Sequence, residues 1–122
     1  MLYVEDEKIY LTKGDDGVLP VNVETGDGAY EMGESDVLTI SVRELPSLDS
    51  PLLLRIQSNP GSNRIVFTPA DTADMQPGRY SADIQLNDGA GRVHTIWPKL
   101  DGSAQYTVKN FKNFVLMPEV TE

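Results

Sequence analysis

The chain is 122 residues long, which is the size of one domain and leaves no room for two independent cores. Nineteen acidic and ten basic residues give a formal net charge of −9, and the bases are scattered, which argues against a nucleic-acid partner. No apolar run reaches the ~20 residues of a membrane span, and without cysteine the chain has neither a disulfide framework nor a thiolate zinc site.

Short runs with a period of two residues dominate the sequence, and no stretch of ten or more residues has helical apolar spacing. Residues 38–43 and 80–86 alternate apolar and polar side chains, which is typical of half-buried strands. About eight strands are expected, at residues 8–12, 17–25, 38–43, 52–58, 63–68, 80–86, 91–99 and 113–120. Periodicity does not decide whether residues 100–110 form a loop or a further edge strand.

Turn-forming residues separate these runs at regular intervals, as in Asn59-Pro60-Gly61, which predicts a hairpin between the two strands that flank it. Regular spacing of this kind favours a sandwich or a barrel. We therefore expect one all-β domain that covers residues 1–122.

The segment TPADTADMQPGRYSADIQL, residues 68–86, predicts a structural corner. Asp71 is expected to accept bonds from backbone N–H groups two or three residues further on, and Met75 to enter the core. Tyr80 follows a Pro-Gly turn as in the tyrosine corner of immunoglobulin-like sandwiches, where the phenol bonds to upstream backbone. The predicted fold is accordingly an immunoglobulin-like antiparallel β-sandwich. The corner residues are Asp71, Thr72, Met75, Pro77, Gly78 and Tyr80.

Five segments carry a family resemblance: KGDDGVLPVNV (13–23), YEMGESDVLTISVRE (30–44), IVFTPADTADMQPGRYSADIQL (65–86), RVHTIWPKL (92–100) and FVLMPEVTE (114–122). In this order they resemble small tail and baseplate proteins of bacteriophages and prophages. The chain is most similar to the immunoglobulin-like amino-terminal domain of baseplate upper proteins.

The resemblance implies a structural or adaptor role in a phage particle, with no catalytic residues and no cofactor. The implied partners are other tail or baseplate proteins and further copies of the chain, while no membrane or nucleic acid is expected. The resemblance also implies synthesis in the bacterial cytoplasm followed by assembly into the virion. The amino terminus has acidic residues where a secretory signal has positive charge, so no export signal is expected.

Three acidic clusters are candidates for catalytic or calcium-binding groups: Asp15 with Asp16, Asp71 with Asp74, and Glu31 with Glu34 and Asp36. None has the spacing of an EF-hand loop, so turn capping and surface charge are expected, with weak calcium binding at a loop as the alternative.

Catalysis has few candidate groups in this sequence. His94 is the single histidine, and neither Ser41 nor Ser81 lies in a Gly-x-Ser-x-Gly elbow. We therefore expect no enzyme activity and no metal site. A small hydrolase that uses the acidic loops is the third-ranked hypothesis.

Aromatic residues offer a second kind of site. Trp97, with Tyr30, Tyr106 and Phe111, belongs either to the core or to a platform for sugars or a protein partner. A cell-surface immunoglobulin-like binding module, carbohydrate-binding in one version, is therefore the second hypothesis. Pro98 after Trp97 indicates an edge or a bulge, and residues 114–120 are apolar on both faces. The candidate interface residues are Trp97, Pro98, Val115 and Met117.

Overall fold

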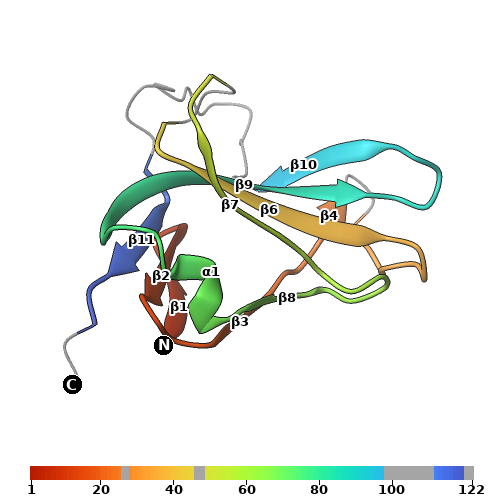
Figure 1. Cartoon of the computed structure of the whole chain (residues 1–122). Helices are drawn as coiled ribbons and strands as arrows, with labels where there is room; N and C mark the ends of the chain where they lie inside the picture. Colours follow the sequence, from red (N-terminus) through yellow and green to blue (C-terminus); the bar gives the residue numbers. More distant parts are fainter. Residues whose placement is uncertain (26–27, 46–48, 98–111, 120–122) are drawn as a thin grey trace.

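The computed structural model describes residues 1–25, 28–45, 49–97 and 112–119 (Figure 1). In chain order, the described elements are β1 (Leu2–Glu5), β2 (Lys8–Thr12), β3 (Gly17–Pro20), β4 (Glu24–Thr25), β5 (Gly28–Ala29), β6 (Val37–Arg43), β7 (Leu52–Gln57), β8 (Arg64–Phe67), α1 (Pro69–Thr72), β9 (Gly78–Asn87), β10 (Val93–Trp97) and β11 (Phe114–Met117).

The fold is an all-β sandwich, as the sequence predicts. The main sheet has the order β1-β2-β11-β9-β6-β7, with β10 paired to β9, and it curls over the two-stranded sheet β3-β8 (Figure 1). A further pair, β4-β5, extends from the loop after β3. The single described helix, α1, follows β8 and leads into β9 at one end of the sandwich (Figure 1).

The core lies between the main sheet and β3-β8. The apolar positions of β6 are fully buried and register with those of β9, so that Leu38 pairs with Leu86 and Ile40 with Ile84. Phe67 of β8 approaches Phe114 of β11 with ring centroids 6.2 Å apart. The predicted inward face of residues 38–43 and 80–86 is therefore confirmed, whereas Thr39 and Ser81, which were expected to face water, are buried.

One strand pair corrects the prediction of a wholly antiparallel sandwich. β11 runs parallel to β2, with Phe114 opposite Ile9 and Leu116 opposite Leu11, whereas its other neighbour, β9, is antiparallel. The alternation of a strand fixes which side chains face the core but not the direction of its neighbour. A parallel neighbour requires a long connection, and almost the whole chain separates β2 from β11.

The predicted hairpin at Asn59-Pro60-Gly61 is wrong, because β7 pairs with β6 in the main sheet and β8 pairs with β3 in the other sheet. Strand boundaries also differ from the predictions. β1 was not expected, and it forms a hairpin with β2 through Asp6 and Glu7, both of which have positive φ. This acidic pair lacks the glycine that usually marks such a turn. The predicted strand 17–25 ends at Pro20 and resumes briefly as β4. β10 covers 93–97 of the predicted 91–99, and Pro98 lies outside the described residues.

Asn113 joins two strands that share one edge of β9. β11 pairs with β9 up to Tyr80, and β10 pairs with it from Ile84 onward. In the gap, the Asn113 side chain accepts a hydrogen bond from the Ala82 N–H at 2.7 Å and donates to the Ala82 carbonyl at 2.8 Å. The amide is 1% exposed and acts like one more strand residue, so the long strand β9 stays paired along this edge.

Candidate interaction surfaces

The predicted corner lies at α1 and the start of β9. The Asp71 carboxylate accepts a hydrogen bond from the Thr68 N–H at 2.7 Å, and Thr68 is the residue that caps α1. The expected direction of this bond was wrong, because Asp71 reaches back to the start of the helix rather than forward. It is the third helical residue, from which a side chain can bond to the capping residue.

The remaining corner residues attach this turn to the sandwich. Thr72 is fully buried and its Oγ1 accepts a hydrogen bond from the Gly14 N–H at 3.1 Å, while Met75 is buried in the core. Pro77 is exposed, and Gly78 begins β9 opposite Leu116 of β11.

Tyr80 bonds to upstream backbone. Its hydroxyl donates to the carbonyl oxygen of Gln76, and its ring packs against the core. Burial, together with the negative charge of Glu44, raises the pKa of the phenol. At neutral pH the hydroxyl therefore keeps its proton and remains a donor.

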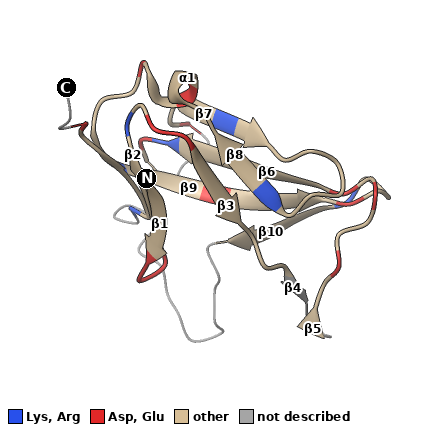
Figure 2. Ribbon diagram, turned by 90° about the horizontal axis from the view of Figure 1, so that it is seen from below, with Lys and Arg blue, Asp and Glu red and all other residues tan. Residues whose placement is uncertain are grey.

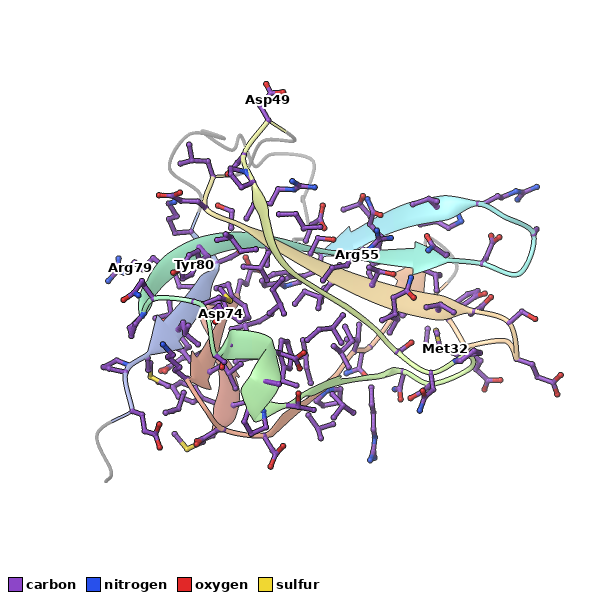
Figure 3. All side chains as sticks on the ribbon, viewed as in Figure 1. Met32, Asp49, Arg55, Asp74, Arg79 and Tyr80 are labelled. Atoms are coloured by element: carbon purple, nitrogen blue, oxygen red, sulfur yellow. The ribbon has the colours of Figure 1, made fainter. Side chains whose placement is uncertain are left out.

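A groove of about 500 Å³ runs beside this corner. We call it the corner groove. It lies between the Leu52 end of β7, α1 and Tyr80, and Figure 3 shows Asp74 and Tyr80 close together at this place. Its lining is Glu44, Leu52, Leu53, Ala70, Asp71, Asp74, Met75, Gln76 and Tyr80. Sequence reasoning singled out the corner but missed the groove, because Leu52 and Leu53 come from a strand distant in sequence.

A second surface lies on the outer face of β1, β2 and β11. We call its residues the outer patch: Tyr3, Tyr10, Val115 and Met117. The Tyr3 and Tyr10 rings stack with centroids 4.7 Å apart and planes 7° apart, and Val115 registers directly with Tyr10. Val115 and Met117 are half-buried, whereas Phe114 and Leu116 between them face the core. Two of the four candidate interface residues therefore lie together on this face.

Trp97 lies elsewhere. It is half-buried, packs against the core and borders a small hollow of about 140 Å³ with Ile96, Val4 and Pro20. Trp97 registers with Ile84, an inward-facing residue, so the structure does not bring it together with Val115 and Met117. Pro98, Tyr106 and Phe111 fall outside the described residues.

The third acidic cluster contains a carboxylate that binds the loops at one end of the sandwich. Asp36 is 4% exposed and accepts hydrogen bonds from the Tyr30 hydroxyl at 2.5 Å, the Gly33 N–H at 2.8 Å and the Gly89 N–H at 3.0 Å. These hydrogen bonds hold the pKa of the Asp36 carboxyl below its usual range, and the bond from Tyr30 has the largest effect. Asp36 therefore ties the loop before β6 to the β9–β10 turn.

The structure does not bring His94 and Ser41 together. His94 is exposed, and its Nε2 lies 3.3 Å from the carboxylate of Asp88, which accepts bonds from the N–H groups of Ala90 and Arg92. Ser41 lies in the middle of β6, opposite Asp83. Within the described residues no group of three or more acidic or histidine side chains is arranged to hold a metal ion.

No helix among the described residues is both long and apolar enough to cross a membrane. Comparison of the chain with protein-family models, with curated proteins and with solved structures found no match.

Proposed function

We propose that this chain is a non-enzymatic structural or adaptor component of a bacteriophage or prophage tail or baseplate. It acts through protein–protein assembly with other tail proteins and with further copies of itself, and it resides in the virion. The proposal is supported by the resemblance of residues 13–23, 30–44, 65–86, 92–100 and 114–122 to such proteins and by the β-sandwich fold.

The observation that carries the proposal is the outer patch. Along β11 the outward positions are Val115 and Met117, and along β1 and β2 they include the stacked Tyr3 and Tyr10. A strand with one face toward solvent normally alternates apolar with polar side chains. The same outward face also has Glu5, Lys8 and Thr12 on β1 and β2. It therefore combines apolar and aromatic residues with polar neighbours, which is the composition of an interaction surface.

The immunoglobulin-like assignment is part of this proposal. The hydrogen bond from the Tyr80 hydroxyl to the Gln76 carbonyl supports it, because a tyrosine bonded to backbone a few residues upstream is a hallmark of these sandwiches. The burial of Met75 beneath the same turn is consistent with a corner where the chain passes from one sheet to the other.

The second hypothesis, a cell-surface binding module for carbohydrate, rests on the half-exposed Trp97. Apart from the indole N–H of Trp97, Asn22 is the one polar side chain among the residues that line the hollow beside Trp97. A sugar site needs several convergent hydrogen-bonding groups around its aromatic platform. Assembly is therefore the better supported function.

The direct test is the protein content of purified tail particles. Particles from cells that carry the gene with an affinity tag are expected to contain the chain at a fixed ratio to the major tail protein, as measured by quantitative mass spectrometry. Particles that assemble and infect normally without it, from a deletion strain, would contradict the proposal. Binding to a glycan array by the same purified chain would favour the second hypothesis.

A further inference from the structure

We propose that the corner groove binds an extended, basic segment of a partner protein, anchored by apolar side chains. The inference rests on the proposed function for the kind of partner and adds the chemistry of the segment that is recognised. The corner groove and the outer patch are separate surfaces, because Arg79 and Tyr80 are consecutive residues of β9 with side chains on opposite sides of the strand (Figure 3). Arg79 registers with Val115 of the outer patch, whereas Tyr80 lines the groove.

The walls of the groove expose apolar surface. Leu52 and Leu53 are 44% and 40% exposed, and both line it at the start of β7. Tyr80 and the buried Met75 form part of the opposite wall. Two adjacent exposed leucines opposite an aromatic ring offer a place where an apolar side chain can leave water.

The charge of the groove selects the partner. Three acidic residues line it, Glu44, Asp71 and Asp74, and no basic residue is among the described residues of its lining. Two bases lie beside the groove: Lys112 donates to the main-chain oxygen of Glu44, and Arg43, which registers with Leu52, donates to that of Ser50. Together they lower the local negative charge by two at most, which leaves an acidic excess. A chain of net charge −9 adds a field of the same sign, so complementary charge requires lysine or arginine in the bound segment.

The position of β7 favours an extended conformation for that segment. Among the described residues β7 ends the order of the main sheet and pairs with β6 alone. Its outward N–H and C=O groups are therefore those of an edge strand, which can pair with an added strand. A segment that pairs with this edge at Leu52 and Leu53 lies directly against the groove.

The test uses fluorescence anisotropy at low salt with a dye-labelled Lys-Leu-Lys-Leu-Lys peptide and its Glu-Leu-Glu-Leu-Glu counterpart. The basic probe is expected to bind the full chain, and the acidic probe is not. The double variant Glu44→Gln/Asp74→Asn should weaken binding roughly three- to thirtyfold, as expected for two partly exposed charge pairs. Asp71 is left intact because it bonds to the residue that caps α1.

The matched control is Glu5→Gln/Asp6→Asn, which changes the net charge equally at the β1–β2 turn. Figure 2 shows this turn well away from α1. Equal weakening by both double variants would overturn the inference, because binding would then follow the overall charge of the chain. Equal binding of the basic and acidic probes would also overturn the inference, because the acidic residues of the corner groove would then have no role in recognition.

A second pair of variants tests the apolar wall. Leu52→Ser/Leu53→Ser should weaken binding of the basic probe roughly tenfold or more, whereas Val66→Ser, at a somewhat more exposed apolar position on β8, should not. Each variant is checked by circular dichroism for an unchanged fold. A chain found in tail particles that binds neither probe would refute this inference alone, whereas probe binding by a chain absent from particles would refute the proposed function.

Discussion

The two faces of β2 and β11 are made of alternating residues of the same strands, yet they have opposite surroundings. On the inner face, Leu11 and Leu116 register with each other and are almost completely buried. On the outer face, Tyr10 and Val115 register in the same way, but both are only half-buried, and the partner ring Tyr3 is 36% exposed.

The comparison separates what the domain needs in order to fold from what it offers to a partner. The inner face is apolar because it packs on Phe67 and the rest of the core. The outer face has no such requirement within the described residues, so its apolar character calls for a different reason. We propose that assembly with a partner is that reason.

The largest expected effect is on the inner face. Leu116→Ala should lower the free energy of unfolding by about 2–5 kcal/mol, because it removes buried methyl groups and leaves a cavity. Val115→Ala, one residue away on the outer face, should change it by only about 0.5 kcal/mol. Urea denaturation of the two variants measures both values, and similar losses would show that the outer face also belongs to the core.

Asn113 is a buried polar side chain on which the pairing of β9 depends. Asn113→Ala leaves the N–H and C=O of Ala82 without these partners, at a cost of about 1–3 kcal/mol for each buried group. The control is Asn63→Ala, since the amide of Asn63 is exposed and bonds to Val21 O at 3.4 Å. A loss in Asn113→Ala no greater than that of the control would mean that the junction contributes little.

Tyr80 lies at the boundary of the inner face, opposite Phe114. Tyr80→Phe should reduce stability by about 0.5–1.5 kcal/mol, the net contribution of one hydrogen bond, and leave association unchanged. Denaturation curves of the wild type and the variant measure the loss of stability, and light scattering measures association. An unchanged denaturation midpoint would show that the bond to Gln76 does not stabilise the corner.

Asp36 should make the loop end of the sandwich sensitive to acid. Hydrogen bonds lower the pKa of its carboxyl in the folded state, so the unfolded chain binds this proton more readily. The contribution of Asp36 is therefore complete above the unfolded pKa of about 3.9 and is lost as the pH falls through the folded value. Stability measured from pH 7 to pH 2.5 should show a gap between wild type and Asp36→Asn that narrows in acid. A gap independent of pH would exclude ionisation as its source.

Strands in which every second residue is apolar and faces the core could be predicted from the sequence. Residues 38–43 and 80–86 could be assigned because each reads as a half-buried strand, and the burial of Met75 followed from its place in the turn. The hydrogen-bonding capacity of Tyr80 was likewise predictable from the Pro-Gly turn before it.

Other features depend on contacts that no local pattern reveals. Three such features join segments that are distant in the chain. They are the parallel pairing of β11 with β2, the hydrogen bonds of Asn113 to Ala82, and the hydrogen bond from Gly89 to Asp36. An asparagine before a strand or an aspartate in a loop is common in turns, so neither residue type signals such a role by itself. The corner groove was missed for the same reason.

The central claim is that the outer patch serves assembly rather than folding, and light scattering of one double variant tests it most directly. Val115→Asp/Met117→Asp places two carboxylates on the outer face, where water can still solvate them, so the circular dichroism spectrum should be unchanged. The wild type is expected to associate as its concentration rises or to form a complex with a co-expressed tail protein, and the variant to remain monomeric. A variant that unfolds, or a wild type that stays monomeric and binds no co-expressed tail protein, would contradict the claim.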